Sequence, residues 1–191
     1  MTTQVLAARS RSDSSTLALR LSTAAAFAAA TALAAQVQIP LPFTPVPVTL
    51  QTAVVLLAGG VLGGGWGAAS MAMYLLAGSI GAPVFAGAES GPGVLLGATG
   101  GYLLAFLLVP PIVARSLPSR GGALRAFAVL LAVSTIVFAW GMLQLAWVLD
   151  VPLGRAFLLG VAPFLAGDLV KVAAATAAFR AARPWVARLR D

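Results

Sequence analysis

The sequence predicts an all-α integral membrane protein, a bundle of six transmembrane helices with both termini in the cytoplasm. Hydrophobic residues make up 60% of the 191 residues, charged residues only 9%, and the mean hydropathy is +0.98. Such a composition is typical of membrane proteins, whose spans are apolar runs of about 20 residues. The chain therefore has room for five or six spans and for one compact bundle rather than two domains.

The distribution of basic residues predicts the orientation, because loops rich in Arg and Lys stay in the cytoplasm. With six spans, ten of the twelve basic residues fall on the side of the N-terminus: Arg9, Arg11 and Arg20, then Arg115, Arg120 and Arg125, then Arg180, Arg183, Arg188 and Arg190. The outer loops hold only Arg155, and Lys171 falls within the last helix. We therefore interpret the net charge of +7 as a topology signal and exclude nucleic-acid binding.

The same pattern divides the chain into three parts. We predict a cytoplasmic tail over residues 1–20, a six-helix transmembrane domain over 21–182 and a basic cytoplasmic tail over 183–191. The first span is the alanine-rich run 21–35, which also fits a cleavable signal peptide. The small residues Ala24, Ala28 and Ala32, four apart, favour a retained helix that another backbone approaches closely.

A proline-rich segment follows the first span. Four prolines lie between Pro40 and Pro47, so this stretch is extended and stiff. It is also apolar and carries Thr44, Thr49 and Gln51. The segment is either a lid across one mouth of the bundle or a rigid connector.

Glycines organise the next two spans. We expect a short helix over 52–62, a tight turn over 63–67 and a third helix to about residue 78. Gly59, Gly63 and Gly67 recur every four residues, which favours close helix packing. A phosphate-binding loop is the alternative, but the sequence has no Walker lysine motif.

The middle of the chain combines glycines with hydroxyl side chains. A loop over 81–93 contains Ser90 and Gly91, and it leads into Thr99, Gly100 and Tyr102. Glycine backbone amides and these hydroxyls are suited to facing a bound molecule. A fourth helix continues to about residue 113, a fifth spans 126–148, and residues 156–162 form a brief re-entrant or surface helix.

Asp168 and Lys171 stand out in the last span, expected over 163–180. They are three residues apart, so they share one face of a helix. A charge near the bilayer centre costs roughly 2.5–3.5 kcal/mol, so this face must line the protein interior or a polar cavity. The pair marks either a ligand site or a structural ion pair. The chain has no Cys and no His, which excludes thiol catalysis and the usual transition-metal sites.

Several short motifs together resemble the BioY family, the biotin-specific S components of energy-coupling factor (ECF) transporters. They occur in order between Pro40 and Lys171, and each alone is weak. One departure is Ala98, where the family usually has proline. The motifs are Pro42-x-x-Pro45-x-Pro47-x-Thr49-x-Gln51-Thr52, Leu57-Ala-Gly59 with Leu62-Gly63, Gly81-x-Pro83-Val-Phe85, Gly97-x-Thr99-Gly-Gly101-Tyr102 and Pro163-Phe-x-x-Gly167-Asp168-x-x-Lys171.

The resemblance implies a multi-pass protein of the cytoplasmic membrane that captures biotin in an external pocket. It is a transporter subunit rather than an enzyme, and biotin is a transported substrate rather than a cofactor. The alternatives are a carrier of another small vitamin or solute and a structural membrane subunit. Site residues implied or suggested are Asp168, Lys171, Gln51, Thr49, Thr44, Phe85, Tyr74, Ser90, Gly91, Thr99, Gly100 and Tyr102.

The resemblance also implies partners. The sequence has no ATP-binding motif of its own, so coupling to ATP requires other subunits. In the family these are a transmembrane T subunit and two ATPases, with the small-residue face of the first helix docking on the T subunit. Carried over to this chain, that face is Ala24, Ala28 and Ala32. The resemblance is also compatible with a homo-oligomer.

Overall fold

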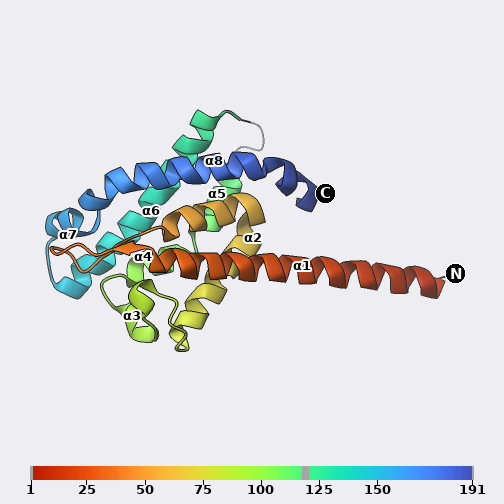
Figure 1. Ribbon diagram of the computed structural model, residues 1–191, viewed down its shortest axis with the longest axis horizontal. Coiled ribbons are helices and arrows are strands. Elements are labelled where there is room, and N and C mark those ends of the chain that lie inside the picture. The colour runs from red at the N-terminus through yellow and green to blue at the C-terminus, as the bar shows by residue number, and fades with distance from the viewer. Residues whose placement is uncertain (1, 118–120, 191) are drawn as a thin grey trace.

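The computed structural model describes residues 2–117 and 121–190, with side chains described over 16–117 and 121–184, and these residues are mostly helical (Figure 1). Arg120 and the ends of both predicted tails lie outside the residues with described side chains. Within the described part, four helical stretches are long and apolar enough to cross a membrane: 16–36, 51–79, 123–149 and 153–184. The all-helical membrane class is therefore confirmed.

The elements follow one another with short connections. A two-stranded antiparallel ladder is the only sheet among the described residues. The elements are α1 (Thr2–Gln36), β1 (Gln38–Ile39), β2 (Val48–Thr49), α2 (Gln51–Ser79), η1 (Ala86–Ala88), α3 (Pro92–Leu96), α4 (Gly100–Ala105), α5 (Val109–Ser116), α6 (Ala123–Leu149), α7 (Leu153–Gly160), η2 (Ala162–Phe164) and α8 (Leu165–Arg190).

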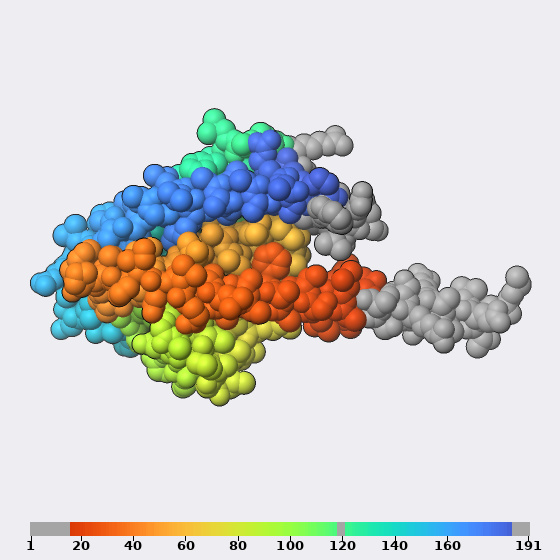
Figure 2. Space-filling view, viewed as in Figure 1, coloured from red at the N-terminus to blue at the C-terminus, as the bar shows by residue number. Residues whose placement is uncertain are grey.

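Helix α1 is longer than the predicted first span, because its N-terminal part continues as helix to Thr2. Ala24 and Ala28 are buried, Ala32 is half-buried, and the helix packs along α2. The face that the sequence assigned to a partner subunit therefore points into the chain's own bundle. Figure 2 shows that another side of α1 is exposed on the face of the molecule turned toward the viewer.

Helix α2 consists of two helical arms joined at Gly63, where the sequence predicted a turn. Gly63 has φ 79° and ψ −179°, a backbone conformation that is essentially restricted to glycine. The residues on both sides of it are helical, so the break is a single residue rather than the predicted five-residue turn. In Figure 1 the two arms leave this bend in different directions.

The other two glycines of the series permit close packing against α5. A Cβ atom on Gly59 would lie 2.7 Å from the Val113 Cβ, and one on Gly67 would lie 2.6 Å from the Pro110 Cβ. Both distances are shorter than van der Waals contact, so any larger residue would separate α2 from α5. The structure therefore confirms the prediction that the glycines spaced four apart allow close packing between helices.

The bend provides a test of this account of α2. We expect Gly63→Ala to destabilise the protein by about 1–3 kcal/mol, because alanine is strained at this φ and ψ. Gly65→Ala is the matched control, since nothing lies within 4 Å of its added Cβ and alanine favours a helix by up to about 1 kcal/mol. Thermal unfolding in one detergent compares the two. Equal melting temperatures would contradict the account.

The predicted fourth helix is divided into α4 and α5, and the short α3 precedes it. The break between α4 and α5 has a local cause, because Pro110 and Pro111 have no N–H to donate to the preceding turn. The interior between these elements and α6 is apolar, with Leu103, Phe106 and Val109 packed into one core with residues of α2 and α6.

Helices α6 and α8 match the predicted fifth and sixth spans and pack against each other. The short helix predicted at 156–162 is present as α7, three residues earlier. Figure 1 shows the start of α1 and the end of α8 at the same end of the molecule. The segment between α1 and α2 and helix α7 lie at the opposite end, where the candidate site is found.

Candidate functional site

The proline segment between α1 and α2 folds back on itself as a hairpin. Gln38 pairs with Thr49 and Ile39 with Val48, which brings the two ends of the segment together. At its tip, the Val46 N–H donates to the Thr44 hydroxyl oxygen at 3.3 Å. We call residues 38–49 the proline hairpin. Val46 is buried in a small apolar cluster with Leu145 and Phe164, which fixes the tip on the bundle.

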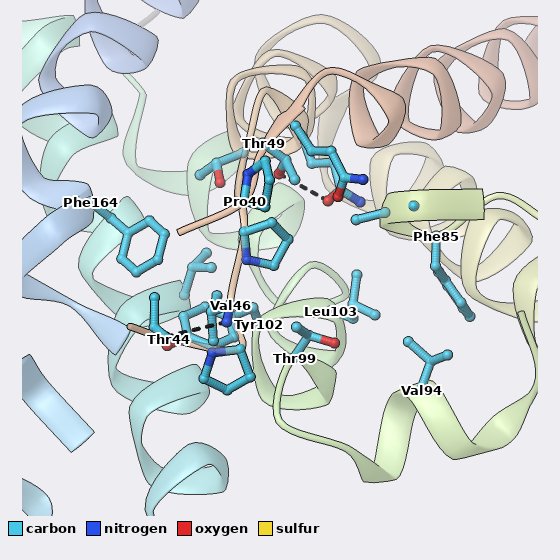
Figure 3. Close-up of a pocket in the computed structure, with 18 of the residues that line it drawn as sticks. Pro40, Thr44, Val46, Thr49, Phe85, Val94, Thr99, Tyr102, Leu103 and Phe164 are labelled. Atoms are coloured by element: carbon cyan, nitrogen blue, oxygen red, sulfur yellow. Dashed lines mark hydrogen bonds between the residues drawn. The ribbon is translucent and has the colours of Figure 1, made fainter. Parts of the chain in front are cut away.

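A cavity of about 280 Å³ lies beneath this hairpin, close to the lower end of the usual range for small-molecule sites (Figure 3). Its walls come from the hairpin, the start of α2, the loop around η1, helices α3 and α4, and the middle of α6. Phe164 and Lys171 close the remaining side. Figure 3 shows Phe164 on the side opposite Phe85 and Val94. The hairpin is thus one wall of the cavity, as the lid interpretation requires.

Lys171 supplies the only cationic side chain among the described residues that line this cavity. It is 8% exposed, and its Nζ donates to the Thr49 carbonyl oxygen at 3.3 Å. An ammonium group has three donors, and this single bond is at the long limit of hydrogen-bond geometry. The remaining N–H groups are available to an acceptor in the cavity.

Asp168 lies one turn before Lys171 and is 2% exposed. Its Oδ2 accepts a hydrogen bond of 2.7 Å from the Ser134 hydroxyl of α6. Its Oδ1 has no hydrogen-bond partner among the described residues, so Lys171 does not bond to it directly. A structural ion pair in direct contact is therefore not the arrangement here. A buried carboxylate oxygen without a partner is costly, and a ligand N–H is one group that would satisfy it.

A chain of hydrogen bonds supports the wall beside the hairpin. The Thr49 hydroxyl donates to the Gln51 Oε1 at 3.0 Å, and the Gln51 Nε2 donates to the Tyr74 hydroxyl at 2.7 Å. The Tyr74 hydroxyl in turn donates to the Val84 carbonyl oxygen at 3.3 Å. Tyr74 also packs edge-on against Phe85, with ring centroids 5.6 Å apart. The hairpin and the loop before η1 are thus held by one network.

The end of α1 holds the same loop from outside. The Gln36 Nε2 donates to the Phe85 carbonyl oxygen at 3.0 Å, and its Oε1 accepts from the Ala88 N–H at 3.1 Å. These two bonds span η1, which contributes Ala86 and Gly87 to the cavity wall. No pattern in the sequence indicates this role, because Gln36 is one polar residue at the end of a span.

Tyr102 and Gln144 support the opposite wall. The Tyr102 hydroxyl donates to the Gly160 carbonyl oxygen at 2.8 Å, so it links α4 to α7 while the side chain lines the cavity. The Gln144 Nε2 donates to the Leu95 and Gly97 carbonyl oxygens, both at 2.8 Å. These bonds fix the turn between α3 and α4, which presents Thr99 to the cavity.

The structure gathers most of the predicted ligand residues around one cavity, but not all of them. Asp168 and Tyr74 are buried behind its wall, and Ser90 lines a neighbouring outer pocket. Gly91 begins α3 with φ 92°, and a Cβ on Gly100 would overlap the Leu95 carbonyl oxygen, so both positions meet backbone requirements. The predicted residues that line the cavity are Thr44, Thr49, Gln51, Phe85, Thr99, Tyr102 and Lys171.

Other lining residues were missed. Phe106, Val137, Phe138 and Phe164 lie on three different elements, and each reads in the sequence as an ordinary apolar residue of a membrane helix. No spacing within one helix would have identified them, because the cavity collects single residues from each element. Glu89 was recognised only as part of a loop, yet it lines the cavity as its acidic residue.

The arrangement is suited to a small molecule with an apolar body and polar ends. Aromatic and aliphatic side chains form most of the wall, while one ammonium, one amide and several hydroxyl groups provide hydrogen bonds. Within the described part of the chain, no group of three His, Cys, Asp or Glu side chains comes together to hold a metal ion. The lining groups suit the binding of a small molecule, and Lys171 is the buried charge among them.

Comparison with known proteins gives one consistent result. Residues 5–188 match the model of the BioY family. The chain is 40% identical over 129 residues to the probable biotin transporter BioY of Pyrococcus horikoshii, covering 68% of this chain and 75% of that protein. It is 35% identical over 129 residues to the biotin transporter BioY of Thermotoga maritima, covering 68% and 76% of the two chains.

The fold has a counterpart among solved structures. The crystal structure of the S-component for biotin from an ECF-type ABC transporter superposes with a TM-score of 0.82. The match covers 87% of this chain and 92% of that chain at 26% sequence identity. The arrangement of helices described above is therefore one that another protein also adopts.

Proposed function

Because this chain belongs to the BioY family, we propose that it is a multi-pass membrane protein that takes up biotin, binding it in the cavity beneath the proline hairpin. The observation that carries this proposal is the cavity itself. It combines aromatic walls with Lys171, whose ammonium makes one long hydrogen bond and has further N–H groups to donate. Biotin has an apolar bicycle and chain with a ureido group at one end and a carboxylate at the other.

The proposed topology has six membrane crossings with both termini in the cytoplasm. The two arms of α2 count as separate crossings, and α3, α4 and α5 together make the fourth. The asymmetry of basic residues supports this orientation. The common position of the start of α1 and the end of α8 in Figure 1 supports an even number of crossings, because an even number returns the chain to its starting side. The cavity then opens on the external side.

Transport against a concentration gradient requires an energy source, and partner subunits would have to supply it because this chain has no ATP-binding motif. We infer that it acts as the S component of an ECF transporter, with a transmembrane T subunit and two ATPase subunits. The solved S-component of similar fold supports this assignment. Since Ala24 and Ala28 are buried in the bundle, the docking surface for the T subunit is not assigned to that face of α1.

Equilibrium binding tests the proposal. The detergent-purified chain is titrated with biotin in a calorimeter, with thiamine and riboflavin as competitors that represent other vitamins. Saturable binding of biotin that neither competitor displaces is the expected result. Binding of another vitamin in place of biotin would move the chain to a carrier of different specificity, and a folded chain that binds none of them would refute the proposal.

A further inference from the structure

Asp168 and Lys171 make no direct contact, although both are buried and lie on the same face of α8. Opposite charges three residues apart on a helix are neighbours that attract each other, and burial strengthens the attraction. Within the part of the chain that the structure describes, however, no hydrogen bond joins the two side chains. Other groups therefore hold the two charges apart.

Each of the two side chains is held from a different element. The Ser134 hydroxyl of α6 donates to the Asp168 Oδ2 at 2.7 Å, whereas the Lys171 Nζ donates to the Thr49 carbonyl oxygen of the proline hairpin at 3.3 Å. Lys171 lines the cavity, and Asp168 is buried behind its wall. The bond from Ser134 is the shorter of the two and has the length of a charge-assisted hydrogen bond. It is therefore the stronger restraint on the pair.

The Ser134 hydroxyl has two acceptors within reach but only one hydrogen to donate. The second acceptor is the Leu131 carbonyl oxygen at 2.8 Å, in the same helix. A carbonyl inside an α-helix already accepts the backbone N–H four residues further on, and a carboxylate is the better acceptor. Ser134 is also fully buried, which excludes solvent as a competing partner. We therefore assign its hydrogen to Asp168.

We propose that Ser134 is a positioning residue for ligand binding, which keeps Asp168 from pairing with Lys171 and so leaves the Lys171 ammonium available to the ligand. The inference rests on the proposed function. Without the Ser134 hydroxyl, the carboxylate loses its donor from α6, and the charged donor on its own face of α8 is Lys171. A direct ion pair would draw the ammonium away from the cavity, and a ligand would have to break that pair in order to bind.

Ser134→Ala tests this role by titration with biotin. We expect its affinity for biotin to fall by roughly ten- to thirtyfold, as for a lost hydrogen bond to a charged group. The melting temperature without ligand should stay within about 3 °C of the parent, because an ion pair replaces the lost bond. Thr135→Ala is the matched control, since the exposed Thr135 hydroxyl bonds only to the Ala132 carbonyl oxygen of its own helix. It should bind as the parent does. Parental affinity in Ser134→Ala would refute the proposal.

The same substitution in an Asp168→Asn background separates positioning from simple packing of α6 against α8. Asparagine retains an acceptor for the Ser134 hydroxyl but has no charge that attracts Lys171. In this background Ser134→Ala should change the affinity for biotin by less than about twofold, because the two sites act through one pair. An equal loss of affinity in both backgrounds would show that Ser134 only packs the helices together, and it would refute the proposal.

A spectroscopic measurement tests the role without a ligand. Lys171 is the only lysine in the sequence, so a chain made with isotope-labelled lysine gives one side-chain nitrogen signal by NMR. This signal should shift in Ser134→Ala and stay in place in Thr135→Ala, because only the first variant changes the partner of the ammonium. No shift in Ser134→Ala, with a parent that binds biotin, would refute the positioning role and leave the proposed function intact. The expected shift with a folded parent that binds no biotin would instead refute the proposed function.

Discussion

Replacing Lys171 with methionine is expected to weaken biotin binding by roughly 100-fold or more. Methionine keeps much of the length and apolar contact of the side chain but removes the ammonium group. The loss follows because a buried charged group that bonds to a ligand contributes about 2–5 kcal/mol when its partner is left unpaired. The acceptor of the ligand would then face an apolar side chain that has no hydrogen to donate. Asp168 would also lose the nearby positive charge of Lys171.

Titration calorimetry with biotin measures this effect, and thermal unfolding of the ligand-free protein shows whether the variant is folded. Leu169→Met is the control, since it places the same residue two positions away on an exposed part of α8. It should bind as the parent does. A folded Lys171→Met protein that binds biotin with parental affinity would remove Lys171 from the site.

The second large effect is expected from Gly100→Ala. A Cβ at this position would overlap the Leu95 carbonyl oxygen and lie 2.5 Å from the Gln144 Nε2. The first of these atoms belongs to the backbone, so the turn between α3 and α4 must move, and the hydrogen bonds from Gln144 are strained. We expect a loss of about 3 kcal/mol of stability, which corresponds to roughly 10 °C in melting temperature.

This experiment also separates two roles for Gly100. The sequence suggested that it faces the ligand, whereas the structure places it where α4 begins, in close contact with Leu95. Thermal unfolding without ligand distinguishes them, because a pure ligand contact would leave the unliganded protein as stable as the parent. Gly154→Ala in α7 is the control, since no atom lies within 4 Å of its added Cβ.

The sequence predicted those features that depend on strong local signals. The break at Gly63, the stiff segment from Pro40 to Pro47 and the long α6 each follow from glycine, proline or an uninterrupted apolar run. Lys171 and Asp168 were identified for a different reason, because charges are rare in a membrane span and require a partner or a cavity. These signals need no knowledge of which helices are neighbours.

Features that depend on the neighbours could not be predicted in this way. Ser134 is one small hydroxyl residue in a long apolar helix, and only the approach of α8 makes it the partner of Asp168. The burial of Ala24 and Ala28 depends in the same manner on α2 lying against α1. A stripe of small residues indicates a close approach by some backbone, and the choice between an internal helix and a partner subunit is made by the fold.

The hydrogen bond between Lys171 and Thr49 joins residues 122 positions apart in the chain. During synthesis at about 5–20 residues per second, the hairpin strand that carries Thr49 therefore precedes Lys171 by roughly 6–24 s. Through most of that interval the unfinished chain has the residues of the proline hairpin but lacks Phe164, which packs against its tip, and Lys171. The cavity is thus complete only when α8 is in place, and we expect the capacity to bind ligand to report that the last helix has inserted.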